Sequence, residues 1–372
     1  RNDERETCFT TETQRHRERQ RKICFQFFSV SLCLCGWWFF VNIFWLQASG
    51  CGGCTQSMIG GEARRGVLEQ LSSAGLDFVA HPALSEESGE EALNVLRDAA
   101  RGELPIDILC IEGAMLRGPN GSGRFHVLAG SGEPMIAWVQ RLAARARYVL
   151  AIGSCTAYGG INASGENITE ACGLQYDGTE RGGLLGVDFL AGSGLPVINV
   201  AGCPIHADWI VDTLMTIAGG TMSVDDLDDL QRPRFYSEQL VHHGCPKNEF
   251  YEFKASAQKA SDLGCLMENL GCKGTQAHAD CNTRPWYGVG SCIRGGFSCI
   301  ACTEPGFEEP GHPFMETPKV AGIPIGLPLD MPKAWFVALA ALSKSATPKR
   351  VRESATRDNP ILLPAAKKGP RR

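Results

Sequence analysis

Cysteine is the residue type that most narrows the chemistry of this sequence. The chain has 372 residues and contains 17 cysteines, an odd number and a high density for its length. Disulfide scaffolds are mostly short secreted domains that cannot build a sufficient apolar core. A chain of this length with 44% hydrophobic residues can build its own core. We therefore expect the cysteines to bind metal or to remain reduced, with metal binding favoured.

Four cysteines share one position relative to the predicted strands. Each follows the end of an apolar run: Cys51 and Cys54 follow 41–47, Cys155 follows 147–152, and Cys203 follows 196–200. The loops after the carboxyl ends of parallel strands converge on one crevice, so four thiolates would meet there. They fit a cubane iron–sulfur cluster or a four-cysteine zinc site. The alternative is that these cysteines act as small buried apolar side chains. That would readily explain one cysteine at the end of a strand, but it explains four in such positions less well.

Eight further candidate ligands lie in the second half of the chain. They form two groups of four: His242, Cys245, Cys265 and Cys272, then Cys281, Cys292, Cys299 and Cys302. Zinc remains an alternative at each site, because CxxC pairs also occur in zinc ribbons. Three zinc sites here would have no evident purpose, whereas three iron–sulfur clusters in series would conduct electrons. The remaining six cysteines are expected to be buried or incidental thiols: Cys8, Cys24, Cys33, Cys35, Cys110 and Cys172.

The elements that would position the ligands alternate between strand and helix. Short apolar runs predict strands, and amphipathic stretches between them predict helices. The strands are expected at 41–47, 77–80, 106–111, 147–152 and 196–200, and the helices at 65–74, 89–101, 134–146 and near 205–218. This alternation is typical of a doubly wound parallel sheet with helices on both faces. It predicts an α/β domain over residues 41–230.

The sequence changes character near residue 230. From 232 to about 310 it shows little periodicity and is rich in Gly, Cys, His and Asn. This predicts an irregular domain over 231–345 that is organised around metal sites. Residues 333–343 predict one helix, which is too short to cross a membrane. Residues 346–372 are rich in Lys and Arg and contain four prolines, which predicts a flexible basic tail.

Residues 1–40 fit neither domain. The uncharged run from Ile23 to Leu46 is long enough to span a bilayer, but such a span would consume the strand expected at 41–47. We therefore favour an irregular extension over a membrane anchor.

The net charge of −5 and the pI near 6.0 argue against a nucleic-acid binder, which usually presents a basic face.

Taken in order, the cysteine segments resemble the small subunit of a nickel–iron hydrogenase. The segments are WLQASGCGGCTQS, GSCTAYGGI, INVAGCPIHADW, HHGC, GCKG and CIACTEPGF. The resemblance covers residues 41–345. It implies an α/β fold in which a flavodoxin-like, doubly wound parallel sheet is followed by an irregular iron–sulfur cluster-binding domain. Within the family, stretches such as LVHHGCPKNEFYEFKASA and FEEPGHPF are most similar to regulatory, hydrogen-sensing small subunits.

The resemblance implies three iron–sulfur clusters and gives each a set of ligands. The sets are Cys51, Cys54, Cys155 and Cys203 for the proximal cluster, His242, Cys245, Cys265 and Cys272 for the distal cluster, and Cys281, Cys299 and Cys302 for the medial cluster. Many respiratory members carry proline in place of Cys292 and a [3Fe–4S] medial cluster. Cys292 as a fourth thiolate predicts that all three clusters are [4Fe–4S], with [3Fe–4S] at the medial site if Cys292 is not a ligand. Gly53 and Gly160 stand where oxygen-tolerant respiratory members add two cysteines, so that feature is not expected.

The resemblance also assigns the cleavage of H₂ to a partner. The sequence lacks the paired CxxC motifs with which large subunits bind nickel, so we expect no catalytic residue here and a nickel–iron large subunit as partner. The expected function is electron transfer in a regulatory hydrogenase that senses H₂ and signals to a sensor histidine kinase controlling hydrogenase gene expression. We expect a cytoplasmic heterodimer or dimer of heterodimers. The alternatives are the small subunit of an energy-conserving uptake hydrogenase and a zinc-stabilised interaction protein.

Three further side chains lie in or near the loops of the proximal ligands. They are Glu112, Tyr158 and Trp209. For each of them we favour packing and hydrogen bonding over a role in proton transfer.

Overall fold

The computed structural model describes residues 40–311 and 314–358, which belong to one compact unit. The predictions for residues 1–39, including the N-terminal extension and its four cysteines, lie outside the described residues.

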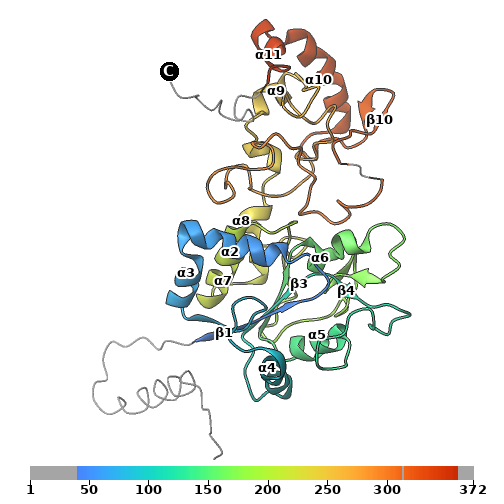
Figure 1. Ribbon diagram of the computed structural model, residues 1–372. Helices are drawn as coiled ribbons and strands as arrows, with labels where there is room; N and C mark the ends of the chain where they lie inside the picture. Colours follow the sequence, from blue (N-terminus) through green and yellow to red (C-terminus); the bar gives the residue numbers. More distant parts are fainter. Residues whose placement is uncertain (1–39, 312–313, 359–372) are drawn as a thin grey trace, which may run out of the picture. The chain divides into compact units, whose positions relative to one another are not determined.

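A five-stranded parallel sheet lies at the centre of residues 40–230 (Figure 1). Its strands are β1 (Val41–Gln47), β2 (Leu76–Ala80), β3 (Ile108–Glu112), β5 (Tyr148–Ile152) and β9 (Ile198–Val200). They are arranged in the order β2-β1-β3-β5-β9, and every neighbouring pair is parallel. This is the flavodoxin-like strand order. The predicted fold class is confirmed, and each of the five predicted strands forms within two residues of its expected limits.

Helices cover both faces of the sheet (Figure 1). On one face lie α2 (Gly53–Arg65), α3 (Val67–Ser73) and α7 (Ala207–Ala218), and on the other lie α4 (Gly89–Arg101) and α5 (Met135–Ala143). Strand β1 shows the division, because its successive side chains point to opposite faces. Ile43 and Trp45 belong to the first core, and Phe44 and Leu46 belong to the second.

Helix α2 was not predicted from the sequence. The expected helix at 65–74 corresponds to α3 alone, and α2 contains the adjacent Gly60 and Gly61. Glycine lowers helix propensity, but here it permits close packing. A Cβ atom on Gly61 would lie 3.2 Å from the side chains of both Ala207 and Val67. Tertiary packing against α7 and α3 therefore outweighs the local preference.

Shorter elements surround the sheet and build the second part of the chain. Around the sheet they are β4 (Met115–Leu116), α6 (Ser154–Tyr158), η1 (Gly160–Ala163), β6 (Ala171–Cys172), β7 (Tyr176–Asp177), β8 (Glu180–Arg181) and η2 (Val224–Asp226). In the second part they are α8 (Arg234–Ser237), η3 (Val241–Gly244), α9 (Asn248–Glu252), β10 (Lys319–Val320), β11 (Ile323–Pro324), α10 (Lys333–Ala346) and α11 (Lys349–Ser354).

The second part of the chain is irregular, as its composition indicated. Between residues 231 and 311 the described chain forms no strand, and its helices span five residues or fewer. Helix α10 coincides with the predicted helix and extends it to Ala346. Among the described residues, every helix is too short or too polar to cross a membrane.

Residues 349–354 form helix α11, where a flexible tail was expected from residue 346. Val351 is 1% exposed and packs with Ala255 and Ala355. Lys349 on the same helix is 88% exposed. The basic residues face solvent while a single apolar residue anchors the helix, so composition alone suggested a solvated tail. Residues 359–372 lie outside the described residues.

Replacing Val351 with Asp should detach α11, because a carboxylate without a partner is costly in an apolar contact. We expect trypsin to cleave the variant between residues 349 and 357 about tenfold faster than the wild type under native conditions. The control Lys349→Arg keeps a cleavage site on the exposed side of the helix and should behave as wild type. Equal cleavage of V351D and wild type would mean that α11 is not held by Val351.

Candidate functional site

The four cysteines expected at strand ends meet at the carboxyl edge of the sheet. Cys51 and Cys54 lie at the junction of β1 and α2, Cys155 lies in α6 just after β5, and Cys203 follows β9. Burial, followed by the nearby thiols Cys203 and Cys51, raises the pKa of Cys155 to about 12. A side chain at position 153 would enter the space between these four cysteines, because a Cβ atom on Gly153 would lie 2.6 Å from Cys54 Sγ. Glycine therefore keeps that space open. The structure thus brings all four together.

His242, Cys245, Cys265 and Cys272 line one small cavity in the second part of the chain. Burial, followed by the neighbouring thiols Cys272 and Cys245, raises the pKa of Cys265 to about 12. The Nδ1 atom of His242 is buried and has no hydrogen-bond partner, while its Nε2 lies 2.8 Å from Asp330 Oδ2. Buried polar atoms are rarely left without a partner, so the free nitrogen fits a metal ligand. The donor set is one nitrogen and three sulfurs.

Cys281, Cys292, Cys299 and Cys302 form the third group. Burial, followed by the thiols of Cys302 and Cys292, raises the pKa of Cys281. Burial, followed by the thiols of Cys272 and Cys302, raises the pKa of Cys299. Cys292 is the exposed member of this group. The structure therefore includes Cys292 among the thiols of the third group.

Hydrogen bonds connect the three groups in a series. The Ser154 hydroxyl, next to Cys155, donates to the carbonyl oxygen of Cys302. On the other side, the backbone N–H of Lys273, next to Cys272, donates to the carbonyl oxygen of Cys299 at 2.8 Å. The third group therefore lies between the group at the sheet edge and the group that contains His242.

Main-chain amides face many of the sulfurs. In three cases the donor is the amide two residues after the cysteine: Cys51, Cys245 and Cys299. Such hydrogen bonds stabilise thiolates and tune iron–sulfur clusters. Buried thiolates that lie side by side repel one another, and a multivalent metal centre removes that cost. The donor sets fit iron–sulfur clusters, and on chemistry alone they also fit zinc.

Comparison with known proteins decides between these possibilities. Residues 51–217 match the family described as NADH ubiquinone oxidoreductase, 20 kDa subunit, and residues 236–315 match the family described as the C-terminal part of the NiFe/NiFeSe hydrogenase small subunit. The chain is 30% identical to the F420 non-reducing hydrogenase II small subunit of Methanosarcina mazei, over 81% of this chain and 82% of that protein. The chain is a nickel–iron hydrogenase small subunit. Small subunits of this family carry iron–sulfur clusters, and hydrogenase activity belongs to the complex with a large subunit.

Two other hydrogenases agree with this assignment. The periplasmic [NiFeSe] hydrogenase small subunit of Desulfomicrobium baculatum is 30% identical, over 73% of this chain and 86% of its own length. The solved structure of the actinobacterial-type NiFe-hydrogenase from Ralstonia eutropha H16 matches with a TM-score of 0.66 and 30% identity, and it covers 87% of this chain and 95% of that chain. The alternative of a zinc-stabilised interaction protein is contradicted by this membership.

Glu112 supports the Cys51–Cys54 turn of this hydrogenase small subunit. Its buried carboxylate accepts hydrogen bonds from the backbone N–H of Cys54 at 3.0 Å, from the backbone N–H of Thr55 at 3.2 Å and from Trp45 Nε1 at 3.2 Å. Helix α2 begins after Gly52 and has no acidic residue in its first turn. Glu112 therefore supplies, from β3, the negative charge and the acceptors that a helix N-terminus needs. This agrees with the hydrogen-bonding role favoured for it.

The other two side chains singled out near the proximal ligands also contribute to packing. Trp209 is buried and donates a hydrogen bond of 2.7 Å from Nε1 to Asp280 Oδ1, beside Cys281. Tyr158 is buried at the end of α6, and its ring packs edge-on against Tyr176.

Arg232 is a positioning residue that the sequence did not identify. Its buried guanidinium donates to Asp228 Oδ2 at 2.7 Å, to Glu304 Oε1 at 2.8 Å and to the carbonyl of Thr303 at 3.0 Å. A buried charge is expensive unless it is paired, and here the carboxylates of Asp228 and Glu304 pair with it. It ties the boundary between the two parts of the chain to the loop that follows Cys302. In the sequence, the one indication of this role was the position of Arg232 near the predicted domain boundary at residue 230.

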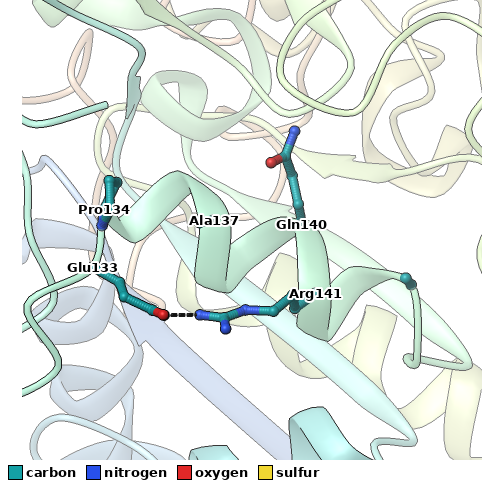
Figure 2. A pocket seen from close by; sticks show the side chains of 6 residues that line it. Glu133, Pro134, Ala137, Gln140 and Arg141 are labelled. Atoms are coloured by element: carbon teal, nitrogen blue, oxygen red, sulfur yellow. Dashed lines mark hydrogen bonds and ion pairs between the residues drawn. The ribbon is translucent and has the colours of Figure 1, made fainter. Parts of the chain in front are cut away.

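A separate surface pocket lies on α5 and contains none of the candidate ligands (Figure 2). Its lining residues are Glu133, Pro134, Ala137, Gln140, Arg141 and Ala144. The one charged contact across it is the ion pair between Glu133 and Arg141. Because this lining contains neither cysteine nor histidine, we assign it no role in metal binding.

Replacing Glu112 with Gln should loosen the start of α2. The variant keeps the size of the side chain but turns one acceptor oxygen into a donor, so at least one buried N–H loses its partner. Such a loss costs about 1–3 kcal/mol, and amide hydrogen exchange over residues 53–56 should accelerate at least about fivefold. Glu103→Gln, in an exposed ion pair with Arg101, is the control and should leave the exchange unchanged. Unchanged exchange in E112Q would contradict the capping role.

Proposed function

We propose that this small subunit holds three iron–sulfur clusters in series and passes electrons from H₂ oxidation in a nickel–iron large subunit to an acceptor. The observation that carries the proposal is the series of hydrogen bonds that joins the three groups, from Ser154 to Cys302 and from Lys273 to Cys299. When bound, the clusters supply one-electron carriers, whose potentials depend on hydrogen bonding and burial. The chain's own residues order the sites, exclude water and donate N–H groups to the sulfurs.

The proposed ligands are the twelve residues predicted from the sequence. They are Cys51, Cys54, Cys155 and Cys203 at the proximal site, Cys281, Cys292, Cys299 and Cys302 at the medial site, and His242, Cys245, Cys265 and Cys272 at the distal site. The proximity of Cys292 to Cys281 and Cys302 supports a four-thiolate medial site. We therefore propose three [4Fe–4S] clusters.

The proximal site supports docking of the large subunit against its edge. Cys51 is exposed, and Gly160, next to Ile161, lies against Cys155, since a Cβ atom on Gly160 would lie 2.9 Å from Cys155 Sγ. The side chains of Ile161 and Ile168 are 57% and 79% exposed, and Asn162 between them donates to the carbonyl of Ser49. An apolar surface beside an exposed ligand favours a protein partner there.

The finer role of the complex stays a proposal. The similarity of stretches such as LVHHGCPKNEFYEFKASA to regulatory members favours a cytoplasmic H₂ sensor that signals to a histidine kinase, as a heterodimer or a dimer of heterodimers. Uptake of H₂ for energy conservation is the second candidate. It is favoured by the relatives named above, which are an F420 non-reducing and a periplasmic hydrogenase.

The cluster content tests the proposed function. We expect about twelve cluster irons and a matching amount of acid-labile sulfide per chain, from three [4Fe–4S] clusters, in protein co-produced anaerobically with its large subunit. About eleven irons with the EPR signal of an oxidised [3Fe–4S] cluster would remove Cys292 from the ligands. Three zinc ions without sulfide would contradict the proposal.

Turnover separates the two physiological roles. A sensor should reduce an artificial dye slowly, and H₂ should change the autophosphorylation of a histidine kinase that co-purifies with the complex. An uptake enzyme should sustain rapid dye reduction, and H₂ should leave such a kinase unaffected. Rapid turnover without a kinase response would rule out the sensor.

A further inference from the structure

A short segment from outside the cysteine motifs covers the distal site. We call residues 327–336 the strap; it runs into the first turn of α10. The backbone N–H of Leu329 donates to the carbonyl of Thr275 at 3.1 Å. Phe336 is buried in a cluster with Tyr251 and Met267, against which Cys265 and Cys272 pack. The strap therefore contacts the walls of the cavity that holds the distal donors.

One side chain of the strap reaches a proposed ligand directly. Asp330 Oδ2 lies 2.8 Å from His242 Nε2 and 3.3 Å from His243 Nε2. An ionised carboxylate can only accept hydrogen bonds, so Nε2 of His242 carries the hydrogen and Nδ1 carries the lone pair. That Nδ1 is buried without a partner in the cavity lined by Cys245, Cys265 and Cys272.

The ring of His242 is also held from its sides. Its centroid lies 5.1 Å from that of Tyr251 and 4.6 Å from that of His243. These contacts restrict where the ring can move, but neither one selects which nitrogen carries the hydrogen. Of the contacts made by the described residues, the hydrogen bond to Asp330 is the one that makes this choice.

We propose that Asp330 is a positioning residue for the distal cluster, which fixes the tautomer and orientation of His242 so that Nδ1 binds iron. This inference rests on the proposed function, because it presupposes a cluster held by His242 and the three cysteines. A carboxylate behind a metal-bound imidazole orients the ring and increases the basicity of the bound nitrogen. A more basic ligand stabilises the oxidised cluster and lowers its reduction potential.

A separate metal ion is the competing explanation of the same residues. His242, His243 and Asp330 place ligand atoms within 4.8 Å of one another. An ion bound there would take Nε2 of His242 and would leave the buried Nδ1 without a partner. The positioning role satisfies both ring nitrogens, and we favour it for that reason.

The test compares Asp330→Asn, Asp330→Ala and Asp330→Glu in the complex with the large subunit, produced anaerobically. D330N keeps the shape and a neutral acceptor but removes the charge. We expect its distal reduction potential to rise by about 59 mV, which is tenfold in the one-electron equilibrium constant. D330A also loses the acceptor, and we expect on the order of tenfold faster loss of distal iron to a chelator. D330E should restore wild-type behaviour at least in part.

The readouts are the redox titration of the distal EPR signal and the iron retained per chain, with the proximal and medial signals as internal references. Asp358→Asn removes the charge of an exposed carboxylate that pairs with Lys259 in the same part of the chain and is the matched control, expected to leave the distal signal unchanged. Wild-type potential and iron retention in both D330N and D330A would overturn the proposal. One bound zinc per chain that is lost in H243Q would overturn it in favour of a separate ion.

Failure of the proposed function would look different. A wild-type complex without a histidine-ligated distal cluster would refute the proposed series of three clusters, whatever result the variants give. If D330A does not assemble, the reduction potential of the distal cluster can still be measured in the isosteric D330N. An unchanged potential in D330N would contradict the proposed effect of Asp330 on the basicity of His242.

Discussion

Buried thiolates repel one another, and this constraint governs most of the structure. The chain gathers eleven cysteines and one histidine into three adjoining groups, and all of these cysteines except Cys51 and Cys292 are at least partly buried. Burial is the largest cause of the raised pKa at Cys54, Cys265 and Cys302. Without positive centres among them, the thiols would have to stay protonated. The surrounding chain is therefore shaped to present N–H groups to the sulfurs and to leave space for metal.

The two parts of the chain meet this constraint in different ways. The sheet has apolar cores on both faces, so its strand ends can hold Cys51, Cys54, Cys155 and Cys203 as rigid loops. The second part has only small apolar clusters of its own, such as the one around Tyr251, Met267 and Phe336. Its remaining buried side chains, including Val241, Ile293 and Phe307, pack into the first core of the sheet domain. Its folding should therefore depend on the sheet domain and on metal, since the binding free energy of a structural metal contributes to folding.

Sequence reasoning identified the ligands and the sheet but not the groups that support them. Central parallel strands are buried on both faces, so they appear as continuous apolar runs such as 108–112 and 148–152. The ligands were found because thiols at strand ends and in CxxC pairs form a pattern. Glu112 and Asp330 form no pattern, because they are ordinary carboxylates that lie 58 and 88 positions from the residues they serve. Helix α2 was missed for a related reason, since the packing that permits its glycines comes from α7.

The supporting groups also explain how the distal site differs in charge from the other two. A neutral imidazole in place of a thiolate makes its donor set less negative by one charge. Asp330 returns a negative charge beyond the imidazole, on a side chain that is 31% exposed. There, water screens it from the three thiolates while the hydrogen bond still transmits its influence to the ring. The site can thus hold its imidazole ligand in one orientation without adding a fourth thiolate to the repulsion, and a neutral acceptor at position 330 would hold the ring without this charge.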